Sequence, residues 1–298
     1  MNLKIRIKGI EFQNPIILAS GTFGYGTLYK EVIEEVGGVV TKGITLKPRE
    51  GNPPPRIYET PSGIVNSVGL ENPGVEKFKR DILPRVSLKR GRLIVNIAGE
   101  SIGDYVRLAE LLSEEKIDGL ELNVSCPNIE KGTDFGQDPE SLYKLVKEVR
   151  EHTRKLLIVK LTPNFVDPLE TAKVCKDGGA DAVSLINTLY ALVIDPERRR
   201  YFLGGERGGL SGPGIKPFAL YCVHRVAGAG IPVIGGGGIV SYRDVIEFLL
   251  AGASSVFIGS ANLTNPFISL QILKDLRGYL KENKIEDIKE LIGGLKEE

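Results

Sequence analysis

Short, continuous apolar runs recur at eight places in this 298-residue chain, and segments with helical spacing lie between them. The runs are rich in Val, Ile and Leu, which is typical of parallel strands that are buried on both faces. We expect strands at residues 15–20, 39–43, 93–97, from 120 onward, 157–161, 182–188, 231–234 and 255–260. This alternation predicts an α/β fold, an eight-stranded parallel (β/α)8 TIM barrel, with a doubly wound open sheet as the alternative.

The segments around these strands complete the predicted architecture. Residues 3–12 alternate apolar and charged side chains, which predicts an N-terminal β-hairpin. Long excursions, at 47–73 and 189–215, follow the second and sixth strands. Helices are expected near 27–36, 74–84, 103–115, 216–228, 266–282 and 285–296, and after the caps Asp138, Asp167 and Ser241. Because no linker or shift in composition divides the chain, we expect residues 1–298 to form a single domain.

The balance of charge and the cysteine content exclude several classes of function. The chain has 39 basic and 38 acidic residues, so it offers no argument for binding nucleic acid or an anionic membrane. It lacks both an apolar run of the ~18 residues that a spanning helix needs and the apolar core of a signal peptide, so the cytoplasm is expected. Its three cysteines are far apart, which indicates neither a disulfide framework nor a metal site.

A polar or backbone-exposing residue follows every predicted strand. In a β/α barrel the functional site lies at the C-terminal ends of the strands. The residues at these ends are Ser20, Lys42, Asn96, Asn123 with Cys126, Lys160, Asn187 with Thr188, Gly237 with Gly238, and Gly259 with Ser260. A single lysine would more often be a surface residue. Several lysines and asparagines on one rim would each need a partner if buried, which favours a ligand site.

Glycines end the last two strands, at 235–238 and at Gly259. Taken alone, the first run is equally consistent with a flexible turn. Two neighbouring strands that each end in glycine and are each followed by a helix favour phosphate binding through exposed backbone N–H groups. The polar groups on the other strand ends suit a flat heterocycle, so FMN fits better than a small sugar phosphate.

Cys126 is the candidate base, although a lone cysteine at a strand end is more often a small buried thiol. His152 and His224 fall in predicted helices away from the rim, and Cys175 and Cys222 fall inside amphipathic helices. A general base must therefore come from Cys126 or from a lysine.

From Leu3 to about Leu280 the chain resembles the dihydroorotate dehydrogenase family, whose catalytic subunit is an FMN-containing β/α barrel of pyrimidine biosynthesis. The motifs that carry the resemblance are Ala19–Thr22, Thr41–Gly43, Asn66–Leu70, Asn123–Asn128, Lys160–Leu161, Ile186–Thr188 and Gly209–Pro213, together with the two glycine loops. In this order and combination they are highly specific.

The resemblance implies a role for each matching residue. One FMN per chain would contact Ser20, Lys42, Gly43, Asn96, Asn123, Lys160, Ile186, Gly212, Gly237, Gly238, Gly259 and Ser260. Dihydroorotate or orotate would contact Lys42, Asn66, Ser67, Val68, Gly69, Leu70, Asn123, Asn187 and Thr188. Cys126 would take the C5 proton while hydride passes from C6 to flavin N5, and the loop 127–138 would act as a lid.

The resemblance also bears on the electron acceptor. Cys126 and the absence of an N-terminal apolar extension argue against the membrane-attached, quinone-using branch, which carries serine at the base position. Of the homodimeric fumarate-using branch and the NAD-linked branch, Ala19–Gly24 is more similar to the second. The chain has no G-x-G-x-x-G between a strand and a helix and no cysteine spacing for an iron–sulfur cluster. The resemblance therefore implies a partner subunit that carries FAD and a [2Fe–2S] cluster, bound to a homodimeric core in a heterotetramer.

Two other functions remain open at this point. One is a flavin-free lyase or isomerase of phosphate sugars on the same barrel, using Lys42 or Lys160. The other is a dihydropyrimidine dehydrogenase module. The lyase or isomerase would bind no flavin, so bound flavin distinguishes it from the dehydrogenase. The dihydropyrimidine dehydrogenase module would act on dihydrouracil rather than on dihydroorotate.

Overall fold

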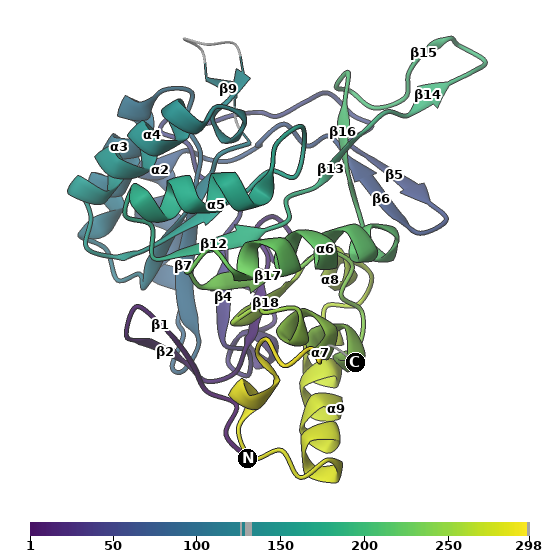
Figure 1. Cartoon of the computed structure of the whole chain (residues 1–298). Coiled ribbons are helices and arrows are strands. Elements are labelled where there is room, and N and C mark those ends of the chain that lie inside the picture. Colours follow the sequence, from purple (N-terminus) through teal and green to yellow (C-terminus); the bar gives the residue numbers. More distant parts are fainter. Residues whose placement is uncertain (126, 129–132, 297–298) are drawn as a thin grey trace.

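The computed structural model describes residues 1–125, 127–128 and 133–296, and within them eight parallel strands form a closed barrel (Figure 1). Closure follows because the last strand pairs with the first, Phe257 opposite Ile17. In barrel order the strands are β3 (Ile16–Leu18), β4 (Gly38–Val40), β7 (Arg92–Ile97), β8 (Gly119–Asn123), β11 (Leu156–Lys160), β12 (Ala182–Leu185), β17 (Val233–Gly235) and β18 (Ser255–Ile258). The predicted (β/α)8 barrel is confirmed, and the open sheet is excluded.

Helices surround the barrel (Figure 1). The main ones are α3 (Ile102–Ser113), α4 (Pro139–Glu151), α5 (Pro168–Asp177), α6 (Lys216–Ala227), α7 (Tyr242–Leu250) and α9 (Ile268–Glu282), with the single turn α8 (Ala261–Thr264) after β18. The three predicted caps stand at N-cap positions, but only Asp167 and Ser241 cap the backbone, whereas the Asp138 carboxylate accepts a hydrogen bond from the Ser141 hydroxyl at 2.6 Å. Asp167 accepts a hydrogen bond from the Leu169 N–H, and Ser241 forms a reciprocal capping box with Asp244.

Three predicted helices are wrong in extent. The segment 27–36 forms only α1 (Lys30–Ile33), which starts after a left-handed Tyr29. The segment 74–84 is broken into α2 (Val75–Lys77), the π-helix η1 (Phe78–Ile82) and the 3-10 turn η2 (Leu83–Arg85), because Pro84 lacks the N–H that a continuing helix needs. The segment 285–296 forms only the 3-10 turn η5 (Ile288–Leu291), since Gly293 then adopts a positive φ.

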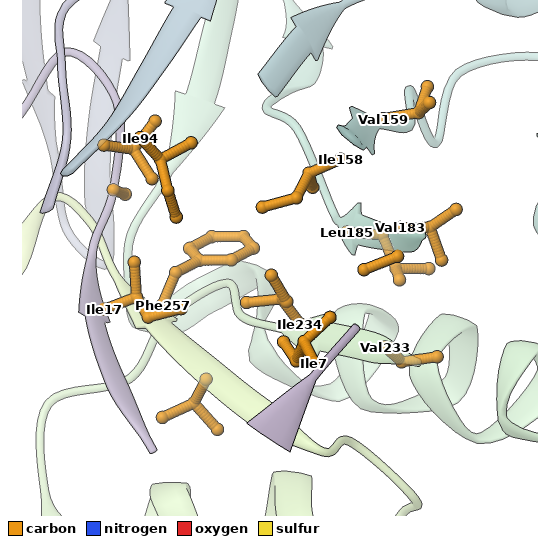
Figure 2. Close-up of a cluster of buried hydrophobic side chains, with 14 of the residues drawn as sticks. Ile7, Ile17, Ile94, Ile158, Val159, Val183, Leu185, Val233, Ile234 and Phe257 are labelled. Atoms are coloured by element: carbon orange, nitrogen blue, oxygen red, sulfur yellow. The ribbon is translucent and has the colours of Figure 1, made fainter. Parts of the chain in front are cut away.

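The barrel interior is filled by apolar side chains (Figure 2). Ile17, Ile158 and Phe257 point into the same buried cluster from three different strands. Ile7 joins this cluster from the predicted hairpin, which consists of β1 (Ile5–Ile7) and β2 (Ile10–Phe12). The hairpin therefore covers the N-terminal end of the barrel, which leaves the opposite end for a site.

The two long excursions meet to form a sheet of their own. The excursion after β4 supplies β5 (Ile57–Thr60) and β6 (Gly63–Asn66), and the excursion after β12 supplies β13 (Leu189–Ala191) and β16 (Gly208–Ser211). They pair antiparallel in the order β13-β16-β6-β5. The outer hairpin β14 (Ile194–Asp195) and β15 (Arg200–Tyr201) extends beyond this sheet (Figure 1), and η4 (Pro213–Ile215) leads from it into α6.

A short antiparallel pair follows β8. It consists of β9 (Pro127–Asn128) and β10 (Thr133–Asp134), and the 3-10 turn η3 (Phe135–Gln137) then leads into α4. Part of the predicted lid at 127–138 lies outside the described residues.

Candidate active site

A cavity of about 480 Å³ lies at the C-terminal end of the barrel, within the size range of small-molecule sites. Every barrel strand contributes to its lining at or just beyond its C-terminal end. In barrel order these residues are Ser20, Lys42, Asn96, Asn123, Lys160, Ile186, Gly237 and Gly259. Parallel strands that close into a barrel bring all their C-terminal ends to one rim, so positions up to 239 residues apart share one cavity.

The structure brings the described members of both predicted residue sets to this one cavity. Besides the eight residues above, its lining includes Gly43, Asn66, Ser67, Val68, Gly69, Leu70, Asn187, Thr188, Gly212, Gly238 and Ser260. The individual roles of these residues stay predictions. Cys126, the predicted base, lies outside the described residues, but its neighbour Ser125 lines the cavity.

The lining is cationic. Lys42, Lys160 and Arg207 contribute positive charge, and none of the described lining residues is Asp or Glu. The Lys160 ammonium lies 5.3 Å from the centre of the Phe257 ring, which separates the cavity from the apolar interior. A cavity of this composition suits an anionic ligand.

Asn96 is buried beside the Lys42–Gly43 segment, with 1 % of its surface exposed. Its Nδ2 donates to Glu121 Oε1 at 2.8 Å. Its Oδ1 has no hydrogen-bond partner within the described part of the chain. An unpaired buried acceptor costs free energy unless a ligand or water donates to it.

Glycine residues line the cavity where the last two barrel strands end. Gly237 and Gly238 have positive φ values of 134° and 84°. A Cβ on Gly237 would lie 2.8 Å from the Ala219 Cβ, so a larger residue is also excluded by packing. A Cβ on Gly259 would meet only the Ala19 Cβ, at 3.8 Å, and would otherwise project into open space. These segments leave backbone free to approach a ligand closely.

An ion-paired network anchors the start of α7, just after the Gly237–Gly238 turn. Asp244 at the start of α7 accepts hydrogen bonds from the backbone N–H groups of Val240 and Ser241, and Lys216 Nζ lies 2.5 Å from its Oδ1. Burial raises the pKa of Asp244, but the hydrogen bonds from Lys216, Val240 and Ser241 outweigh it and hold the pKa below the usual value.

A cluster of amides joins the ends of β8 and β12. Asn187 Nδ2 donates to Asn123 Oδ1 at 3.3 Å and to Ser125 Oγ at 3.0 Å. The Tyr105 hydroxyl donates to the Asn123 carbonyl at 2.6 Å, and the Thr188 N–H donates to Asn187 Oδ1 at 2.9 Å. These bonds hold polar groups beside the predicted position of the substrate and fix the backbone at Asn123, three residues before Cys126.

The sheet from the two excursions forms the outer wall of the cavity and contributes residues that the sequence reasoning missed. Ile57, Ile64, Tyr190 and Arg207 line the cavity from this sheet or its flanks. The Arg207 guanidinium lies 4.2 Å from the centre of the Tyr190 ring. No periodicity marks these positions, because they reach the cavity only when distant segments pair.

A second missed residue lies next to Lys42. Glu71 Oε2 is 3.7 Å from the Lys42 ammonium and 2.7 Å from Arg56. Burial is the larger cause that raises the pKa of Tyr25 to about 12, and the negative charge of Glu71 raises it further. The Asn66–Leu70 motif runs directly into Glu71, so this position was identifiable as a neighbour of the substrate motif.

The residues that the sequence reasoning set aside lie away from the cavity. Cys175 and Cys222 are buried in α5 and α6, and burial raises the pKa of the Cys222 thiol to about 11. His152 Nδ1 lies 3.0 Å from a carboxylate oxygen of Glu110 on the surface. Within the described residues no group of three or more His, Cys, Asp or Glu side chains is arranged to hold a metal ion. Across the same residues, no helix is both long and apolar enough to cross a membrane.

Comparison with known proteins gives a consistent result over almost the whole chain. The sequence profile of the dihydroorotate dehydrogenase family matches residues 2–280. Proteins named dihydroorotate dehydrogenase B (NAD(+)), catalytic subunit, from Thermoanaerobacter sp. (strain X514) and Thermodesulfovibrio yellowstonii are each 48% identical over 300 residues, covering 99% of this chain and 99% of the relative. A protein of the same name from Bacteroides thetaiotaomicron is 46% identical over 299 residues, with 99% of each chain covered.

Proposed function

The chain belongs to the dihydroorotate dehydrogenase family, and on this premise we propose that it oxidises dihydroorotate to orotate in pyrimidine biosynthesis. The family identified from the sequence motifs is thereby confirmed. One observation supports the assignment of the site: all eight barrel strands end around one cationic cavity, and the family motifs lie at these strand ends. We further propose that residues 1–298 form one FMN-binding domain.

The residues present fit FMN. The unpaired Oδ1 of Asn96 calls for a donor, the lining is cationic, and the glycine turns leave room that a Cβ would fill. Gly237, Gly238, Gly259 and Ser260 would hold the phosphate through backbone N–H groups. The remaining groups would hold the rest of the flavin: Ser20, Lys42, Gly43, Asn96, Asn123, Lys160, Ile186 and Gly212. Bound FMN supplies a hydride acceptor.

The substrate would lie beside the amide cluster. Lys42 would pair with its carboxylate, displacing the 3.7 Å contact with Glu71. Asn123, Asn187 and Thr188 would orient the ring, with the segment Asn66–Leu70 closing over it. The sheet that carries Ile57 and Tyr190 would exclude water from the reacting atoms.

Cys126 is proposed as the base that takes the C5 proton of dihydroorotate. The proposal rests on the family motif Asn123–Asn128, since Cys126 itself is outside the described residues. Within the family, cysteine at this position distinguishes the branches that do not use quinone.

We propose that the electrons pass to NAD⁺ through a partner subunit that carries FAD and a [2Fe–2S] cluster. The names of the relatives support this, because each is called a catalytic subunit of an NAD(+) enzyme. The assembly would be a heterotetramer around a homodimeric core. The cytoplasm is the proposed location, and it is consistent with three cysteines that are too few and too far apart for the disulfide framework of many small secreted domains.

The test starts from the absorption spectrum of the purified protein. Bound yellow flavin that is bleached anaerobically by dihydroorotate, and not by dihydrouracil, is the expected result. A colourless protein that cannot be loaded with FMN would contradict the proposal and favour a flavin-free lyase or isomerase. The acceptor is tested next: fumarate turnover by the isolated chain would indicate the homodimeric branch, whereas NAD⁺ turnover only with a co-purifying flavin and iron–sulfur subunit is expected.

A further inference from the structure

A buried carboxylate, Glu121, lies behind the cavity wall. It stands on β8 in the barrel interior, with 4 % of its surface exposed, and it does not line the cavity itself. Its Oε1 accepts from Asn96 Nδ2 and its Oε2 accepts from Ser184 Oγ, each at 2.8 Å. Both oxygens therefore act as hydrogen-bond acceptors, toward Asn96 and Ser184.

This arrangement decides which way the Asn96 amide faces. An amide has a donor end and an acceptor end, and a carboxylate oxygen that accepts a hydrogen bond can pair only with the donor end. Nδ2 therefore faces Glu121, and Oδ1 faces away from it. Within the described residues Oδ1 has no partner. A Cβ on Gly43 would lie 2.9 Å from this oxygen, so the bare glycine leaves the space beside it open.

We propose that Glu121 is a positioning residue, which holds Asn96 so that its carbonyl oxygen accepts a hydrogen bond from a ring N–H of the bound ligand. The inference rests on the proposed function, because FMN and orotate each carry an imide N–H between two carbonyl groups. If the amide were turned round, its NH2 group would face that N–H, and both would be donors. Glu121 thus sets the polarity of one contact without touching the ligand.

A purely structural role makes a different prediction. If Glu121 serves only the fold, its replacement by an apolar residue lowers stability, because the donors of Asn96 and Ser184 lose their acceptor, but it does not alter the ligand contact. Glu121→Leu would then leave ligand binding unchanged. Under the proposal it frees the Asn96 amide to turn and weakens binding.

The experiment compares Glu121→Leu with Glu121→Gln, and uses Ser184→Ala as the matched control. One arm measures the FMN dissociation constant by titrating the apoprotein and following flavin fluorescence. The other arm measures the orotate dissociation constant of FMN-loaded protein from the flavin absorbance. Glu121→Leu should weaken one of the two by roughly tenfold, the scale of one lost hydrogen bond. The arm that responds identifies whether FMN or orotate supplies the N–H.

The conservative variants should retain binding within about threefold of the wild type, the lower part of the range for a hydrogen bond. In Glu121→Gln the Oε1 atom still accepts from Asn96, while its NH2 group donates to Ser184 Oγ. In Ser184→Ala the bond between Glu121 and Asn96 is untouched. A double-mutant cycle then tests the route: in an Asn96→Leu background, Glu121→Leu should cause no further loss.

Unchanged affinity of Glu121→Leu for both ligands would overturn the inference, as would an equal loss in the Asn96→Leu background. If circular dichroism shows that Glu121→Leu does not fold, Glu121→Met takes its place in the same cycle. The two proposals fail differently. Wild-type protein that binds no FMN refutes the proposed function, whereas wild type and Glu121→Leu that bind both ligands equally refute only this inference.

Discussion

A single methyl group added at Gly259 should separate ligand binding from stability. Gly259 follows β18 and lines the cavity, and its backbone φ is not positive. A Cβ built there meets only the Ala19 Cβ, at 3.8 Å, which is ordinary van der Waals contact. Since Ala19 also lines the cavity, the new methyl group would project into the space that the ligand uses.

The expected magnitudes follow from this geometry. The folded protein accommodates the methyl group, and the loss of freedom in the unfolded chain stabilises the fold by about 0.4–1 kcal/mol. A ligand that packs directly on the backbone of Gly259 meets one extra methyl group, which costs about 1–3 kcal/mol. This converts to an FMN dissociation constant that is roughly 5- to 150-fold higher.

The assay is a pair of measurements on the same preparation: thermal unfolding of the apoprotein and titration with FMN. Gly278→Ala is the matched control. Gly278 is an exposed residue of α9, and a Cβ there meets nothing within 4 Å. This control should stabilise the helix by about 1 kcal/mol and leave FMN affinity unchanged. Gly259→Ala with wild-type FMN affinity would refute the reasoning, because the ligand would not then approach this backbone.

Three further outcomes are expected. The Cys126→Ser variant should bind FMN normally, but its flavin should be reduced by dihydroorotate at neutral pH about 10²-fold more slowly or slower still. Stopped-flow reduction rates equal to those of the wild type would remove Cys126 from the mechanism. Gly237→Ala places a Cβ 2.8 Å from the Ala219 Cβ, at a φ of 134°. It should destabilise the apoprotein by about 3 kcal/mol and lower the unfolding midpoint by about 6–12 °C. An unchanged midpoint would contradict the packing argument. Because hydrogen bonds hold the folded pKa of Asp244 below its usual value, its contribution to stability is present above the unfolded pKa of about 3.9 and is lost as the pH falls through the folded value. Asp244→Asn should therefore be less stable at pH 7 and lose less stability on acidification, and denaturant midpoints that fall in parallel with those of the wild type would contradict this.

Much of the fold could be predicted because parallel strands buried on both faces are continuous apolar runs, which stand out in any window of the chain. The helices were less predictable. Residues 285–296 have helical spacing, yet they form only a 3-10 turn, because Ile288 and Leu291 are buried in the core and Gly293 adopts a positive φ of 67°. Such local outcomes depend on tertiary contacts that override intrinsic propensity.

Most positions of the candidate site could likewise be located from the sequence, for a topological reason. A closed parallel barrel places the C-terminal end of every strand on one rim, so the order of strands alone brings Ser20, Lys160 and Gly259 to one cavity. Family motifs then supply the expected roles. The sequence therefore determined the barrel, the end that carries the site and the strand-end residues around it.

Only the tertiary structure decided which other residues complete the cavity. The outer wall, with Ile57 and Tyr190, forms when excursions more than 100 residues apart pair, as in the hydrogen bond from Asn66 to the Gly209 carbonyl. In the sequence, Glu121 is only one charged residue within an apolar strand. Its pairing with Asn96 and Ser184 depends on the registers of three neighbouring strand pairs, β7 with β8, β8 with β11, and β11 with β12. Side-chain contacts across strands arise from that register, and no local pattern encodes them.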